Sequence, residues 1–306
     1  MRRFRNLLAV IDDVRGESPA LARAAALARA NEGRLTLATC LEPMPLAAGT
    51  PGDELETILR GHYLEFLGGL RERLVGDGLP VSARLLEGIP FIEIIREVVR
   101  GRHDIVLKPA EASGRGNQHF GSTDLHLIRK CPCPVLVVPP EPPTRFARVL
   151  AAIDPASEDP EVGVLNDRIL ELATSLAAGD AARLDVLHCW QLPAEAILRS
   201  RTGTRFAEIS ATEEAAHRRA LAELVARFER RGAAMDPHLV HGDPRAVIPD
   251  FIRSRGVDAV VMGTSSRSPI PGFLIGSTAE EVLAQIRCAV LAVKPPSFVT
   301  PIGLEG

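Results

Sequence analysis

The stretch LLAVIDD, from Leu7 to Asp13, returns in altered form as VLAAIDP, from Val149 to Pro155. Four further blocks repeat in the same order. They are GRLTLATCLEP (33–43) with ARLDVLHCWQLP (182–193), GIP (88–90) with GDP (242–244), HDIVLK (103–108) with VDAVVM (257–262), and CPVLVV (133–138) with CAVLAV (288–293). Five matched blocks in one order indicate two copies of a domain of about 150 residues, a common domain size. Residues 1–140 are called copy one and residues 146–296 copy two; the proline-rich segment EPPT (141–144) links them.

Composition limits the class of protein. The 306 residues have a formal net charge of -3, and 46% are hydrophobic, which is enough for two buried cores. The charge is not gathered into a basic face, so we expect no direct binding of nucleic acid. No run reaches the roughly 18 apolar residues that span a bilayer, and the N-terminal apolar run is too short for a signal peptide. We therefore expect a cytoplasmic chain with no membrane partner. The five cysteines lack zinc-site spacing, which predicts reduced thiols and no metal site.

Each copy alternates short apolar runs with longer helical patterns. The runs are almost continuously apolar, which is typical of parallel strands covered on both faces. The order predicts two tandem, doubly wound, five-stranded parallel α/β sheets of the Rossmann-like kind. The stretch 191–231 is long and predicts a loop or short helix before a main helix whose core is residues 213–231. The expected strands are 6–11, 34–40, 82–87, 105–108 and 135–138 in copy one, and 149–153, 184–189, 236–241, 259–262 and 290–293 in copy two.

The last strand of each copy is apolar and would lie at a sheet edge. Exposed apolar edges favour pairing with another strand. We therefore expect CPVLVV and CAVLAV to join the copies into an internal pseudo-dimer with an approximate two-fold axis. A homodimer of the whole chain is left open.

In an open α/β sheet, ligands bind beyond the carboxyl ends of the strands. The most informative stretch there is MGTSSRSPIPGFLIGSTAEEV (262–282), in which a glycine ends a strand and Gly-Ser-Thr opens a helix. Glycine permits close approach of a phosphate, and a helix start attracts anions. One interpretation is a phosphate site. The other is that Ser277 or Thr278 caps the helix, with Glu280 or Glu281 completing a capping box.

These motifs resemble the universal stress proteins. The spacing G-x2-G-x9-G-[ST] after a strand ending in MG is similar to their nucleotide loop, and Gly263, Gly276 and Ser277 match it. The aspartate ending the first strand, GxP before the third helix and the CPVLVV strand also fit. The resemblance covers nearly the whole chain twice, and TDLHLIRKCP (123–132) is similar to the tandem, two-domain branch.

The resemblance implies an adenine nucleotide alpha-hydrolase-like fold with ATP or ADP, and Mg with it, as the ligand of copy two. The implied contacts are Asp154 and Cys189 near adenine and ribose, Met262 and Gly263 at the strand end, Ser266 in the loop, and Gly276, Ser277 and Thr278 at the phosphates. Ser266 replaces the second glycine of the pattern, and Pro269 and Pro271 remove two N–H donors from the loop. Copy one departs further, because Pro109 stands where copy two has Gly263.

Three functions stay open. The first is a ligand-responsive stress-resistance factor that binds a nucleotide in copy two without turnover, with copy one mainly structural. The second keeps the fold but binds a lipid-like or hydrophobic metabolite. The third is a weak ATPase, and no catalytic residue is assigned because no nucleophile stands with a base in the sequence.

Overall fold

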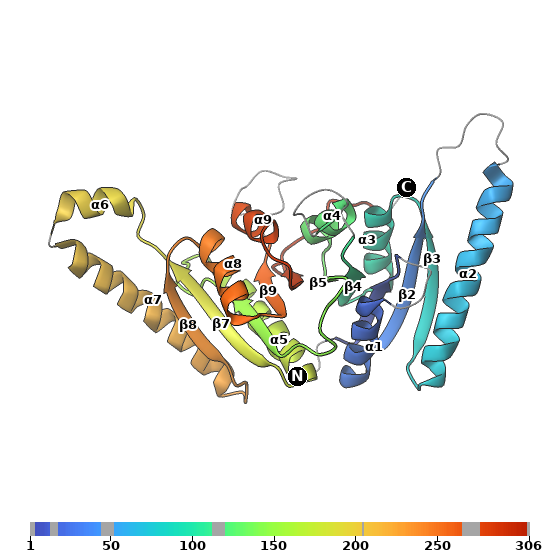
Figure 1. The fold of residues 1–306 in the computed structure, drawn as a ribbon, viewed down its shortest axis with the longest axis horizontal. Helices are drawn as coiled ribbons and strands as arrows, with labels where there is room; N and C mark the ends of the chain where they lie inside the picture. The colour runs from blue at the N-terminus through green and yellow to red at the C-terminus, as the bar shows by residue number, and fades with distance from the viewer. Residues whose placement is uncertain are drawn as a thin grey trace.

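The computed structural model describes residues 4–12, 18–43, 52–111, 120–203, 205–264 and 276–304. Within these residues the strands form one continuous sheet in the order β3-β2-β1-β4-β5-β10-β9-β6-β7-β8 (Figure 1). The strands are β1 (Asn6–Val10), β2 (Arg34–Leu41), β3 (Val81–Glu87), β4 (Ile105–Pro109), β5 (Val135–Val138), β6 (Arg148–Ala152), β7 (Arg183–Trp190), β8 (Asp236–His241), β9 (Ala259–Gly263) and β10 (Ala289–Val293). The helices are α1 (Pro19–Asn31), α2 (Gly52–Gly76), α3 (Pro90–Gly101), α4 (Ser122–Lys130), α5 (Pro160–Asp180), α6 (Glu195–Thr202), α7 (Arg205–Glu229), α8 (Pro244–Arg255) and α9 (Ser277–Leu283).

The predicted fold class is confirmed. All pairings within a copy are parallel, and β1 and β6 each lie at the centre of their half, where the doubly wound order reverses. The two halves are not separate sheets, because β5 pairs antiparallel with β10, with Val137 opposite Val290. Both strands are buried along their whole length, so the junction hides two apolar edges.

Helices cover both faces of the sheet and make three layers. One buried core contains side chains of α1, α2, α5 and α7, and the other contains those of α3, α4, α8 and α9. The strands therefore bury both of their faces, which explains their almost continuous apolar sequence. β3 with α2 lies at one end of the molecule and β8 with α7 at the other (Figure 1).

The segment between β7 and β8 contains the predicted short helix, α6, before the main helix. α7 extends from Arg205 through most of the predicted core, and Gly203 separates the two helices with φ 55° and ψ -124°. Only glycine adopts that backbone conformation without strain. Nothing in the described residues forms a helix with the length and apolar composition to cross a membrane.

Two ion pairs tie the copies together beside the β5–β10 junction. Arg23 on α1 pairs with Asp180 on α5 and lies over the Phe146 ring, with the guanidinium carbon 3.7 Å from its centroid. On the opposite face Arg129 on α4 pairs with Glu280 on α9. These ion pairs therefore join α1 and α4 of copy one to α5 and α9 of copy two.

Candidate functional site

The carboxyl edge of copy two brings several predicted site residues to neighbouring strands. Met262 and Gly263 end β9, which pairs with β6 at Ala152, and Asp154 follows β6. Asn166 on α5 fixes the Asp154 backbone, since its Oδ1 accepts from Asp154 N at 3.0 Å and its Nδ2 donates to Asp154 O at 2.8 Å. The Asp154 side chain is 42% exposed at this edge. A carboxylate held in this way can accept hydrogen bonds from hydroxyl groups of a ligand.

Cys189 lies on the adjacent strand β7, and its thiol is not a nucleophile. Burial raises its pKa to about 12, and the carboxylates of Asp243 and Asp154 add to this rise. The thiol therefore stays protonated at neutral pH and acts as a small apolar group in the wall of the edge.

Packing explains Gly263. A Cβ atom on it would lie 2.7 Å from Cδ2 of Leu165 on α5, so any side chain would require Leu165 to move. The next residue, Thr264, is fully buried, and its Oγ1 donates to Ile128 O in copy one at 3.3 Å. This end of β9 is thus shaped by neighbouring helices, and the glycine is not by itself evidence for a phosphate.

The interpretation that Ser277 or Thr278 caps α9 is wrong. The N-cap residue is Gly276, with no side-chain cap bond, and Ser277 and Thr278 belong to the first turn. The third helical residue is Ala279, so no capping box forms. Ser266, together with Pro269 and Pro271, lies outside the described residues.

In copy one, the corresponding edge is filled by an ion cluster around Lys108. The Lys108 side chain is 1% exposed, and its Nζ lies 2.6 Å from Asp12, 2.9 Å from Asp124 and 3.6 Å from Glu111. Burial alone would lower the pKa of this lysine, but Asp12 and Asp124 together outweigh it, and the pKa is raised. Lys108 is therefore a permanent cation inside the cleft of copy one.

Carboxylates of copy one also occupy the start of α4. Asp124 Oδ2 accepts from the backbone N–H groups of Gly121 and Glu111, each at 2.9 Å. The Glu111 side chain lies against Gly121, because a Cβ atom there would overlap its carboxylate. A carboxylate of the chain itself thus already occupies two N–H groups beside this helix start, where an anion would be attracted.

The repeat makes the two edges directly comparable. Lys108 and Asp124 of copy one correspond to Met262 and Ala279 of copy two. Both copy-two residues are uncharged and buried, and they pack in the same apolar cluster. The internal ion pair that fills copy one is therefore missing from the described part of copy two. Sequence reasoning missed this exchange, although the aligned repeat contains it.

A second feature missed from sequence is a chain of histidines beside Asp154. His188 on β7 is 1% exposed and lies 2.8 Å, Nε2 to Nδ1, from His217 on α7. Trp190 stacks on His217 and meets His241 edge-on. The aligned repeat contains this difference between the copies, because His188, Trp190 and His241 replace Thr39, Leu41 and Glu87 of copy one.

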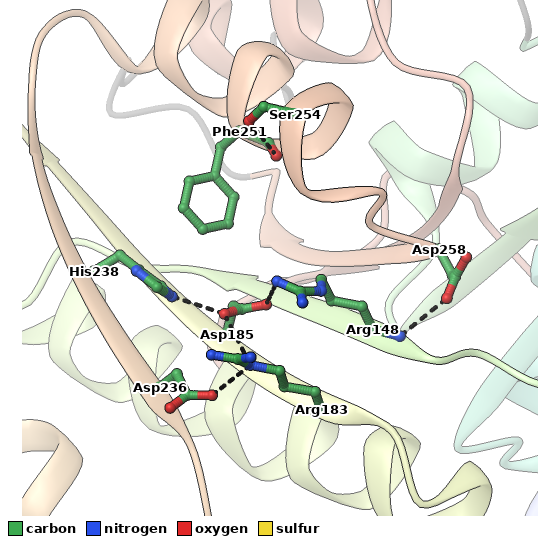
Figure 2. A network of polar contacts seen from close by, with 8 residues as sticks. All are labelled: Arg148, Arg183, Asp185, Asp236, His238, Phe251, Ser254 and Asp258. Atoms are coloured by element: carbon green, nitrogen blue, oxygen red, sulfur yellow. Dashed lines mark hydrogen bonds and ion pairs between the residues drawn. The ribbon is translucent and has the colours of Figure 1, made fainter.

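A buried carboxylate holds the amino-terminal halves of the copy-two strands together. Asp185 on β7 is fully buried, and it accepts from His238 Nε2 at 2.7 Å and from Arg148 at 3.2 Å (Figure 2). Arg183 lies 3.8 Å from it and pairs with the exposed Asp236 at 2.6 Å. The network joins β6, β7 and the edge strand β8. Among the described residues no group of three or more His, Cys, Asp or Glu side chains is arranged to hold a metal ion.

Two doubly wound halves in one sheet define a tandem α/β protein with Rossmann-like domains. The chain belongs to the Universal stress protein family, whose sequence model matches residues 3–139 and 145–294. It is 29% identical to Universal stress protein E of Escherichia coli (strain K12), over 100% of this chain and 98% of that protein. The same identity is found with Universal stress protein E of Salmonella typhi, over 100% and 99%.

Solved structures agree with this assignment. A protein of Pseudomonas aeruginosa UCBPP-PA14 assigned to the same family superimposes with a TM-score of 0.73 and 25% identity, over 96% of this chain and 95% of that one. A universal stress protein of Archaeoglobus fulgidus DSM 4304 has a TM-score of 0.66 at 16% identity, over 95% and 97%. The latter likeness concerns the fold alone. Membership of the family supports a role in the response to stress.

Proposed function

We propose that the chain is a stress-resistance factor that binds one adenine nucleotide, ATP or ADP, in copy two without turning it over. The observation that carries this proposal is the difference between the two edges. Copy one fills its own anion position with Asp124 and Glu111 around Lys108, whereas copy two has Met262 and Ala279 at the matching positions. One ligand site per chain follows.

The residues of copy two suit the parts of a nucleotide. Asp154 presents a half-exposed carboxylate at the end of β6 for ribose hydroxyl groups, and Cys189 offers a neutral wall for adenine. Gly276, Ser277 and Thr278 stand where the phosphates would meet the chain, and Mg would arrive with those phosphates. The neutral Cys189 thiol and the lack of an assigned nucleophile favour binding without chemistry.

A transplant tests the proposal. The double variant Met262→Lys with Ala279→Asp introduces the ion pair of copy one into copy two, and calorimetry with ATP and ADP compares it with the wild type. The wild type should bind one nucleotide per chain, and the transplant should bind none. The matched control is Ala279→Asn alone, which has nearly the volume of aspartate but no charge and should keep most of the affinity.

Three results would contradict the proposal. Two equal sites per chain would show that copy one is open despite its ion cluster. Full affinity in the transplant would place the ligand elsewhere. No heat with either nucleotide would exclude this ligand class and favour the hydrophobic metabolite, while steady-state release of phosphate from ATP would make the protein an enzyme.

A further inference from the structure

The buried pair His188–His217 has its tautomers fixed by its bonds. His188 Nδ1 lies 3.2 Å from the carbonyl oxygen of Ile153, and its Nε2 lies 2.8 Å from Nδ1 of His217. A carbonyl only accepts, so Nδ1 of His188 carries a proton and its Nε2 has none. His217 must then donate through Nδ1. The neutral pair therefore has one arrangement of protons.

The same geometry sets how many protons the pair can gain. One added proton goes to the outer nitrogen of His217, Nε2, and the bond between the rings survives. Transfer of the bridging proton then moves the positive charge onto His188. A second proton would place two N–H donors against each other across 2.8 Å and break the bond. The geometry therefore allows the pair to gain a single proton with the bond between the rings intact.

Asp154 is the carboxylate that this charge faces. Its Oδ1 lies 4.0 Å from His188 Nδ1, and Ile153, whose carbonyl holds His188, is its neighbour in the chain. The pKa of His188 is lowered overall, chiefly by burial, with Asp154 opposing this shift and His217 adding to it. The site carboxylate and the buried pair thus form one electrostatic unit.

Several charged groups on the surrounding elements are paired with one another. His241 on β8 lies 2.9 Å from Glu195 on α6 and meets the pair only through the Trp190 ring. On α7, Glu214 pairs with Arg218, and Arg227 pairs with Asp167 of α5. Asp154, 4.0 Å from His188, is the carboxylate that directly faces a charge on the pair.

We propose that the His188–His217 pair takes up one proton when a phosphate-bearing ligand binds at copy two, so that this site binds such ligands more tightly at acidic pH. The inference rests on the proposed function. A positive charge in the wall of the site attracts an anion, and by linkage the bound anion stabilises the protonated pair. The regulation is specific to copy two, because Thr39 stands at the same position in copy one. There the Thr39 hydroxyl donates to Ile11 O at 2.8 Å and cannot titrate.

The test measures the affinity for ADP between pH 8 and pH 5.5. Wild-type affinity should rise roughly tenfold on acidification, the order of magnitude expected for one additional unit charge near the ligand at an effective dielectric constant of about 20. His188→Thr, which copies the natural solution of copy one, and His217→Gln, which keeps a donor but no titrating ring, should lose that rise. His62→Gln on α2 of copy one is the control and should behave as the wild type.

Ring NMR without ligand gives a separate readout. The His188 and His217 signals should shift together with the uptake of one proton, and His217→Gln should change the titration of His188. Independent titration of the two rings overturns the proposal. ADP binding with a pH dependence that persists in His188→Thr overturns the linkage alone, whereas no ADP binding at any pH overturns the proposed function and the linkage with it.

Discussion

Replacing Lys108 by methionine, the residue that copy two has at the matching position, should destabilise copy one strongly. Asp12 and Glu111 are 38% and 33% exposed and can turn towards water when the lysine is removed. Asp124 is fully buried and would be left without its cation. Leaving one buried charge unpaired costs about 3–5 kcal/mol. For a unit of about 150 residues this corresponds to a fall in Tm of roughly 10 °C.

The double variant Lys108→Met with Asp124→Ala should recover most of that loss. It removes both buried charges and leaves the residues of copy two in their place. What remains is the loss of the Asp124 acceptor for the N–H groups of Gly121 and Glu111, worth about 1–2 kcal/mol. The two substitutions should therefore be non-additive by about 3 kcal/mol.

The assay is urea denaturation of the wild type, both single variants and the double variant. Circular dichroism follows the whole sheet, whereas fluorescence of Trp190, the one tryptophan of the chain, follows copy two. Lys108→Met should shift the circular dichroism transition first. If the double variant loses as much stability as the two single variants together, Lys108 and Asp124 do not act as a pair, and the ion cluster does not hold this edge together.

Two further predictions concern other buried charges. Lys294 has its Nζ 3.1 Å from Thr264 O, and burial lowers its pKa from 10.5 to about 7. Between these two pH values the unfolded chain binds one more proton than the folded chain, so the free energy of unfolding should rise by up to about 1.4 kcal/mol per pH unit. In a denaturation series from pH 7 to 10, Lys294→Met should lack this part of the slope, and an unchanged slope would refute the prediction. Asp185→Asn should lower the free energy of unfolding by about 2–4 kcal/mol, because it weakens the bonds to His238 and Arg148. Asp236→Asn removes an exposed pair with Arg183 and should lower it by less than about 1 kcal/mol. Equal urea midpoints for the two variants would count against the network in Figure 2.

The fold could be predicted because its signals are local. Each strand is a short, nearly continuous apolar run, and every predicted strand end lies within one residue of the observed one. The Gly203 break was harder to place, since the weak periodicity of residues 192–210 hides both the end of α6 and the start of α7. Single-residue boundaries of this kind depend on packing against the sheet, which a helical pattern does not contain.

The site was only partly predictable because its chemistry is non-local. Lys108 meets Asp12 across 96 residues, and His188 meets His217 across 29. Position in the sequence suggests that Asp154, Cys189 and Met262 lie near one edge, and the pairing of β6 with β7 and β9 explains why. It does not reveal which neighbouring charges are already paired. Gly263 is a different case. Its position in the sequence suggests a phosphate site, but its packing against Leu165 is enough to explain why a glycine stands there.

The tandem arrangement explains how two edges of one fold can differ so much. In a dimer of identical chains, a lysine such as Lys108 would fill both clefts or neither. Here the copies share one sheet through β5 and β10, so a copy whose edge is filled still supports its partner. Arg129 of α4 pairs with Glu280 of α9, and Thr264 at the end of β9 donates to Ile128 of α4. Since Lys108 and Asp124 fix the start of α4 and its last turn contacts Thr264, the ion cluster of copy one supports the carboxyl edge of copy two.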